Sequence, residues 1–194
     1  RLETAARALG IELPGGCEFI EKVVLETARA HGREEAYLRL VVTRGSGELG
    51  VDPTTCHEPR VICIADEVRL YPEEKRREGL AVVTSSLRKP PADALDPRIK
   101  SLNYLNSVLA KREARLQGAD EALLLNMHGM VAEASVANIF AVRAGVLLTP
   151  PASDGALEGI TRATVLELAE AHGVPSRVMT LGRFDLFGAD EVFL

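Results

Sequence analysis

Lys100 is the first residue of this sequence whose type and setting could do chemistry. Only five lysines occur against eighteen arginines, and the others lie beside charged residues or in an expected linker. Lys100 follows Ile99 and precedes Leu102, where that linker meets a long expected helix. A lysine held among apolar groups can act as a nucleophile toward aldehydes. Composition alone leaves an ordinary solvated lysine as the alternative.

Glu133 is the second candidate, because it lies in the apolar, small-residue stretch 130–140 without a basic neighbour in sequence. A buried carboxylate needs a partner, since an unpaired buried charge costs several kcal/mol. Two partners are open at this point: a distant arginine, or the protonated nitrogen of a bound heterocycle. Asn138, five residues later, is interpreted as a structural residue of a strand turn.

The third candidate is the segment Gly159-Ile160-Thr161, which directly precedes an amphipathic helix. Free backbone N–H groups at a helix start, together with a hydroxyl, can bind a phosphate. An ordinary N-cap at Gly159 or Thr161 explains the same residues, and the spacing alone favours that simpler interpretation.

Two other motifs are weaker. Residues 45–50 (GSGELG) match the dinucleotide fingerprint GxGxxG, but that motif needs a helix to begin there. Pro53 and Pro59 follow closely and oppose a helix, so a glycine-rich turn between strands is predicted. Cys56-His57 lacks a second pair of ligands, so no metal site is predicted.

Periodicity and turn residues predict the elements that must position these groups. Helices are expected at 1–9, 17–30, 102–117 and 160–172, and strands at 36–43, 61–65, 80–86, 121–126, 130–133, 137–143, 146–148, 174–180 and 190–194. In the helix at 102–117, apolar residues share one face: Leu102, Leu105, Val108 and Leu109. The charged stretch 71–79 is expected to be a surface connection.

This mixture predicts an α+β (mixed α/β) fold with two lobes. We expect a small N-terminal α/β domain over residues 1–86, an interdomain linker at 87–98 with three prolines, and a larger β-rich C-terminal domain with helices over 99–194. The chain begins at Arg1 within an expected helix and stops within an expected strand. We therefore expect that both domains continue beyond the sequence.

Composition excludes several function classes. The 194 residues are 46% hydrophobic and 26% charged, as in ordinary globular domains. The net charge of −5 comes from interspersed acids and bases, so no nucleic-acid partner is expected. No apolar stretch is long enough to span a bilayer, so no membrane partner is expected. Three scattered cysteines suit a reducing cytoplasm better than a disulfide scaffold.

Together these pieces resemble the class IV (fold type IV) pyridoxal-phosphate aminotransferases. The resemblance rests on 98–105 (RIKSLNYL), 133–140 (EASVANIF), 149–151 (TPP) and 157–162 (LEGITR), in matching order and spacing. It extends over essentially the whole chain and implies the two-lobed fold type IV architecture.

The resemblance implies pyridoxal 5'-phosphate as cofactor and a role for each matching residue. Lys100 resembles the lysine that forms a Schiff base with the cofactor and moves the proton at the substrate Cα. Glu133 resembles the carboxylate that pairs with the pyridine nitrogen, which keeps the ring an electron sink. The other matching residues resemble contacts of the phosphate (Arg1, Gly159, Ile160 and Thr161), of the ring face (Leu157) and of the phenolic oxygen (Tyr104).

Within the family, 37–39 (YLR) and 43–50 (TRGSGELG) look most like the branched-chain amino-acid aminotransferases. Tyr37 and Arg39 are then candidates to bind the substrate carboxylates. The implied reaction exchanges the amino group between Leu, Ile or Val and 2-oxoglutarate. Two alternatives stay open: an aminodeoxychorismate lyase or D-amino-acid or amine transaminase of the same family, and a non-catalytic cofactor-binding or dimerisation module. The resemblance also implies small-molecule amino acids and 2-oxo acids as partners, and a homodimer.

Overall fold

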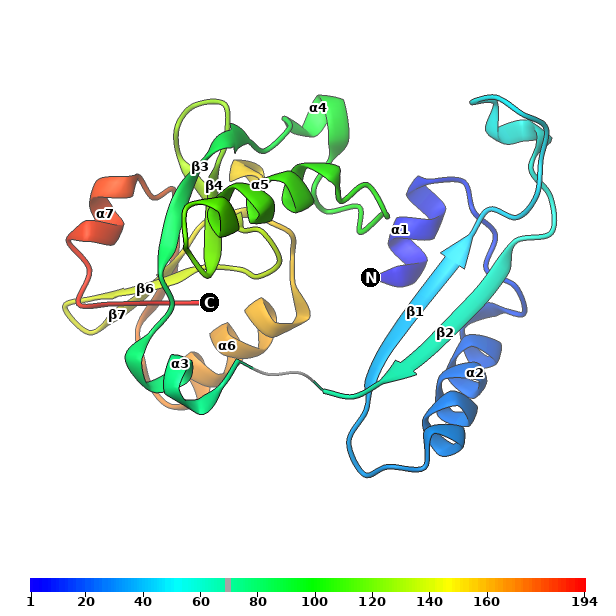
Figure 1. The fold of residues 1–194 in the computed structure, drawn as a ribbon, viewed down its shortest axis with the longest axis horizontal. Coiled ribbons are helices and arrows are strands. Elements are labelled where there is room, and N and C mark those ends of the chain that lie inside the picture. The colour runs from blue at the N-terminus through cyan, green and yellow to red at the C-terminus, as the bar shows by residue number, and fades with distance from the viewer. Residues whose placement is uncertain (69–70) are drawn as a thin grey trace. The chain divides into compact units, whose positions relative to one another are not determined.

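The computed structural model describes residues 1–68 and 71–194, and the chain divides into two compact units, Arg1–Glu73 and Glu74–Leu194. Helices and strands occur in both units (Figure 1), so the expected mixed α and β class is confirmed. In the described residues, no helix combines the length and the apolar character needed to cross a membrane.

The first unit is built on an antiparallel pair of strands. Its elements are α1 (Leu2–Ala8), α2 (Gly16–His31), β1 (Tyr37–Thr43) and β2 (Arg60–Asp66). The two strands pair along their full length, and α2 packs on them. Side chains alternate between two faces of a strand. Val61, Cys63 and Ala65 are half-buried, whereas Ile62 and Ile64 are exposed.

The glycine-rich segment after β1 forms a turn, as predicted. The chain returns through a short 3-10 turn, Pro53–Thr55, and Ser46 pairs with His57 across the loop. Gly45 has a φ of +97°, and a Cβ there would lie 1.9 Å from the backbone oxygen of His57. Backbone packing therefore accounts for this glycine without a bound dinucleotide.

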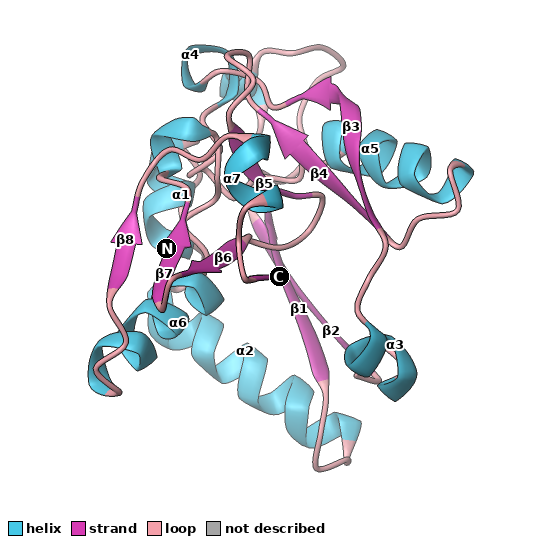
Figure 2. Cartoon of the chain, turned by 90° about the vertical axis from the view of Figure 1, so that its left-hand side faces the viewer, coloured by secondary structure: helices cyan, strands magenta, loops and turns pink. Residues whose placement is uncertain are grey.

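The second unit contains two sheets and most of the helices (Figure 2). Its elements are α3 (Glu73–Glu78), β3 (Val82–Arg88), α4 (Ala92–Leu95), α5 (Leu105–Leu116), β4 (Glu121–Leu125), β5 (Val131–Ala134), β6 (Phe140–Arg143), β7 (Val146–Thr149), α6 (Ile160–Ala171), β8 (Ser176–Val178), α7 (Arg183–Phe187) and β9 (Glu191–Phe193). The strand orders are β3-β4-β5 and β8-β7-β6-β9. In the first sheet, β4 is parallel to β3 and antiparallel to β5.

The units divide earlier than the linker expected at 87–98. The reason is β3, which pairs with β4 and so belongs to the second unit. Residues within the expected linker also form structure, because β3 continues to Arg88 and α4 covers Ala92–Leu95. The charged stretch after Tyr71 contains α3 instead of being only a surface connection.

The packed face of α5 differs from the apolar face that the sequence suggests. The helix begins at Leu105, later than expected, and Leu102, Leu105, Val108 and Leu109 are all exposed. Its buried residues are two alanines, Ala110 and Ala114, which pack with Ala122 and Leu124 of β4. Small side chains let the helix approach the sheet closely.

The core of the second unit lies between its two sheets. Every residue of β4 is buried, because α5 covers one face and side chains from β5, β6 and β7 cover the other. The ring of Phe140 in β6 stacks on that of Phe193 in β9, with centroids 4.9 Å apart. This core supports β5 and the start of α6, which carry the candidate site.

Candidate functional site

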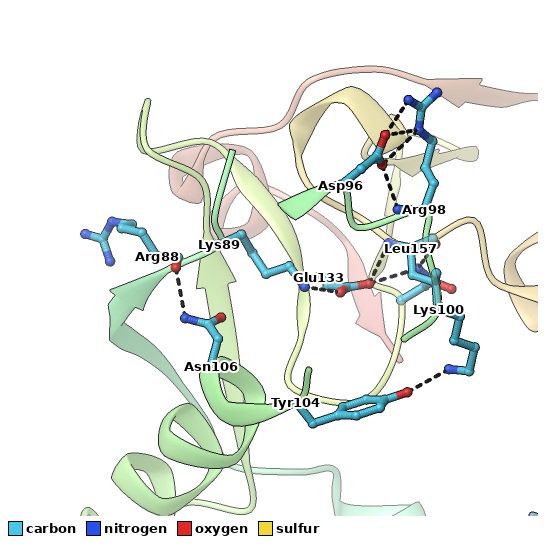
Figure 3. A network of polar contacts seen from close by, with 10 residues as sticks. Arg88, Lys89, Asp96, Arg98, Lys100, Tyr104, Asn106, Glu133 and Leu157 are labelled. Carbon is cyan, nitrogen blue, oxygen red and sulfur yellow. Dashed lines mark hydrogen bonds and ion pairs between the residues drawn. The ribbon is translucent and has the colours of Figure 1, made fainter. Parts of the chain in front are cut away.

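Glu133 is a buried carboxylate with a partner on each oxygen. It lies in β5, and its side chain is 11% exposed. The ammonium of Lys89 donates to Oε1 at 2.7 Å, and the backbone N–H of Leu157 donates to Oε2 at 2.9 Å (Figure 3). Of the two kinds of partner left open by the sequence, a distant cation is therefore present, and it is a lysine and not an arginine.

Lys89 reaches Glu133 from the end of β3, within the segment expected to be a linker. Its backbone N–H donates to the Leu125 carbonyl of β4 at 2.9 Å. Just before Lys89, the pairing of β3 with β4 shifts its register between Thr84 and Arg88. The Glu113 carboxylate binds this segment by accepting from the Ser85 hydroxyl and the Ser86 N–H. The hydrogen bond from Ser85, followed by that from Ser86, lowers the pKa of Glu113.

The start of α6 lies directly beside Glu133. Leu157 is half-buried, and two residues later Gly159 is the N-cap of the helix. Among the described residues, no side chain caps α6, because a glycine has none to offer. The first N–H groups of a helix have no acceptor within it. The N–H groups of Ile160 and Thr161, both in exposed residues, can therefore bind an anion.

Lys100 is exposed in this chain, contrary to the expected apolar surroundings. Its ammonium donates to the hydroxyl of Tyr104 at 3.1 Å and lies 5.8 Å from the centre of that ring (Figure 3). The two residues lie on the turn before α5, and Tyr104 is the N-cap of that helix. A primary amine and a phenol are thus held together at the surface of the second unit.

A charged turn holds the Lys100 segment. The guanidinium of Arg98 binds both carboxylate oxygens of Asp96, and the Arg98 N–H donates to the same side chain at 2.9 Å. These bonds, the side-chain ones first, lower the pKa of Asp96 to about 2. The pKa of Arg98 is raised chiefly by Asp96 and further by the charge of Glu158. Glu158 belongs to the loop before α6, so this charge links the lysine segment to that loop.

The second unit thus combines three kinds of groups that a phosphorylated aldehyde of a nitrogen heterocycle requires. Lys100 supplies an amine, Glu133 supplies a buried carboxylate, and the start of α6 supplies unpaired N–H donors. Glu133 and the α6 start are joined directly by the Leu157 hydrogen bond. The donor set is therefore suited to a ligand with an aldehyde, a basic ring nitrogen and a phosphate.

The remaining candidate residues lie in the first unit. Tyr37 and Arg39 project from the same face of β1, where the guanidinium donates to the tyrosine hydroxyl at 3.3 Å. Arg1 is the N-cap residue of α1 and is exposed. Their roles in binding substrate and phosphate stay predictions, because these residues belong to a separate unit from Lys100.

Two residues that contact the site, Lys89 and Asn138, are not identified as site residues by the sequence patterns. Lys89 lies in the segment predicted as a linker. The one signal for its role is that a buried Glu133 requires a cation, which any basic residue of the chain could supply. Asn138 is predicted to be a structural residue of a strand turn, and its amide does bond to the backbone, donating to the Leu157 carbonyl at 2.8 Å; it also lies 3.5 Å from Glu133 Oε2. No sequence signal shows that contact, because nineteen residues separate Asn138 from Leu157.

Comparison with known proteins gives a consistent result over the full chain. Residues 1–194 match the family described as amino-transferase class IV. A Methanocaldococcus jannaschii protein, provisionally named as a branched-chain-amino-acid aminotransferase, is 46% identical over 194 residues, which are 100% of this chain and 66% of that protein.

Two solved structures are also similar. The branched-chain aminotransferase of Thermoproteus uzoniensis with norvaline has a TM-score of 0.91 and 37% identity, and it covers 98% of this chain and 63% of its own. The branched-chain amino acid aminotransferase of T.th., complexed with N-(5'-phosphopyridoxyl)-L-glutamate, has a TM-score of 0.91 and 38% identity, with 98% and 62% covered. The chain spans just under two thirds of the length of the relatives it matches.

Proposed function

Because this chain belongs to the amino-transferase class IV family, we propose that its protein is a pyridoxal-phosphate-dependent branched-chain amino-acid aminotransferase. The observation that carries the proposal is the hydrogen bond between Glu133 and Leu157, which joins a buried carboxylate to an uncapped helix start. The similar enzyme of T.th., which is complexed with a phosphopyridoxyl group joined to glutamate, supports both the cofactor and the amino donor.

The residues present fit that cofactor. Lys100 would bind its aldehyde, Glu133 its ring nitrogen, and Tyr104 its phenolic oxygen. The N–H groups at Ile160 and Thr161 would bind the phosphate, where the positive end of the helix dipole favours an anion. When bound, the cofactor supplies a ring that accepts electrons from the substrate Cα.

Each residue then has a task that its surroundings support. Lys100 takes the proton from the substrate Cα, and the Tyr104 hydroxyl, 3.1 Å away, orients the amine. Glu133, as a carboxylate, would keep a proton on the ring nitrogen, and Lys89 is paired with the same carboxylate. Leu157 would pack on the ring face, and Gly159 leaves the helix start without a capping side chain.

We propose branched-chain L-amino acids and glutamate, with their 2-oxo acids, as substrates. Arg1 would add a charged contact to the phosphate. Tyr37 and Arg39 would bind substrate carboxylates, because a guanidinium matches a carboxylate with two parallel hydrogen bonds. Norvaline, the ligand named for the Thermoproteus uzoniensis structure, is an aliphatic amino acid and supports this substrate class.

We also propose a cytoplasmic homodimer. The three cysteines are free, which suits a reducing compartment. Exposed apolar side chains at the start of α5, with Leu105 71% and Leu102 68% exposed, offer surface that a second copy could cover. Light scattering of the purified protein tests the dimer.

Spectroscopy and turnover test the proposed activity. The purified protein should carry a yellow absorbance band that shifts when leucine is added, and it should convert leucine and 2-oxoglutarate. Lys100→Ala should lose both, whereas Lys22→Ala, a change of an exposed lysine on α2, should lose neither. A preference for D-alanine over leucine would favour the D-amino-acid alternative, and a band without turnover would favour a non-catalytic module.

A further inference from the structure

Asn138 lies between the two parts of the candidate site. Its amide nitrogen donates to the Leu157 carbonyl at 2.8 Å, while the Leu157 N–H donates to Glu133 Oε2 at 2.9 Å. The same amide nitrogen lies 3.5 Å from Glu133 Oε2. The backbone of Leu157 is therefore held at both its N–H and its carbonyl by side chains on or just after β5.

Gly159 shows how tightly Asn138 is packed against this turn. Its φ of −69° and ψ of 148° suit any residue, so backbone conformation does not require a glycine. A Cβ at this position, however, would lie 2.1 Å from Oδ1 of Asn138, and the next neighbour outside Asn138 is Cβ of Arg162 at 3.7 Å. The Asn138 side chain alone occupies the space that a larger residue would need.

We propose that Asn138 is a positioning residue that couples the carboxylate end of the site to the phosphate end. It does so by fixing the turn from Leu157 to Gly159, which carries the start of α6. This inference rests on the proposed function, because the two ends matter together only for one ligand that spans them. A site that is already arranged for both ends of its ligand binds more tightly than one that must be ordered.

Titrations of the cofactor-free protein test the coupling. Pyridoxal 5'-phosphate and pyridoxal, which lacks the phosphate, are titrated and followed by absorbance, and circular dichroism confirms that each variant is folded. Asn138→Ala should weaken binding of the phosphorylated compound about tenfold and of pyridoxal less, because a partly buried hydrogen bond that orients the phosphate end is lost. The preference for the phosphate should therefore fall.

Asn126→Ala is the matched control, because that amide side chain also orders a turn by bonding to its backbone, here by accepting from the N–H groups of His128 and Met130 between β4 and β5. It should leave the preference for the phosphate unchanged. Asn138→Ser replaces Asn138→Ala if the latter does not yield folded protein, since serine is also too short to reach the Leu157 carbonyl in the same way.

A second pair of variants tests the packing directly. Gly159→Ala alone should weaken binding of pyridoxal 5'-phosphate at least tenfold, because of the clash with Asn138. The double variant Asn138→Ala/Gly159→Ala should bind it as Asn138→Ala does, because the clash is gone. An unchanged phosphate preference in Asn138→Ala, or additive losses in the double variant, would overturn the inference. Wild-type protein that binds neither compound would instead overturn the proposed function.

Discussion

Lys89 and Glu133 form a buried ion pair, with the ammonium 2.7 Å from Oε1 and side-chain exposures of 12% and 11%. Lys89 directly follows β3 and Glu133 lies on β5, and β4 lies between these two strands in one sheet. Removal of one partner from such a pair leaves the other charge buried without compensation. The stability of the site therefore depends on a lysine outside its sequence motifs.

We expect Lys89→Met to destabilise the protein by about 3 kcal/mol, the usual cost of an uncompensated buried charge. The double variant Lys89→Met/Glu133→Gln should recover part of this loss, because no charge is then left unpaired. Urea unfolding of the cofactor-free variants measures both effects. Equal midpoints for Lys89→Met and the wild type would show that the pair contributes nothing.

The Tyr104 hydroxyl is expected to orient Lys100 for proton transfer. Tyr104→Phe removes the acceptor that lies 3.1 Å from the ammonium, and it should lower kcat about tenfold while the cofactor remains bound. Steady-state kinetics with leucine, together with absorbance of the bound cofactor, separate the two effects. Unchanged kcat in this variant would contradict the assigned role.

The buried carboxyl of Glu121 is expected to make the stability of the folded protein depend on pH. Burial alone raises the pKa of this carboxyl, but hydrogen bonds from Lys111, Ser135 and the Ala122 N–H outweigh it, so that its pKa is lowered from 4.5. A carboxyl whose pKa is lowered in the folded state stabilises the protein at pH values above its pKa in the unfolded chain, 4.5. This stabilisation is lost as the pH falls from 4.5 through the lower pKa of the folded state.

Lys111→Met should therefore reduce stability at pH 7 by about 3 kcal/mol, because Glu121 is 1% exposed and loses its counter-ion at 2.7 Å. The difference from the wild type should shrink as the pH falls through 4.5 and lower, because Glu121 takes up its proton near 4.5 in the unfolded chain and only at lower pH in the folded wild type. Unfolding curves at several pH values measure this convergence. A difference that stays constant down to pH 3 would count against Glu121 as its source.

The close approach of α5 to its sheet can be tested by overpacking. Ala114 is fully buried against β4, so Ala114→Leu should destabilise the protein by about 2 kcal/mol. Arg112→Ala, an exposed change on the same helix, should alter stability by less than about 0.5 kcal/mol. Thermal unfolding compares the two. Equal effects of both changes would indicate that the helix is free to move away.

Local patterns determined most of the elements and the nature of the chemical groups. Hydrophobic periodicity and glycine positions placed α2, α6 and nearly all strands to within a few residues, because amphipathic patterns and turn residues act over short distances. The same patterns pointed to Lys100, to Glu133 and to the glycine before α6. The short helices α3, α4 and α7 were not predicted, since a helix of a few residues shows little hydrophobic periodicity.

Only the tertiary structure decided which residues complete the site. Lys89 meets Glu133 because β3 and β5 both pair with β4, and Asn138 meets Leu157 because the turn after β5 packs on the loop before α6. The exposure of Leu105 and the burial of Ala114 likewise follow from how α5 packs on the sheet. Strand pairing and packing join residues far apart in the chain, and the energies that select these contacts arise only once the chain is folded.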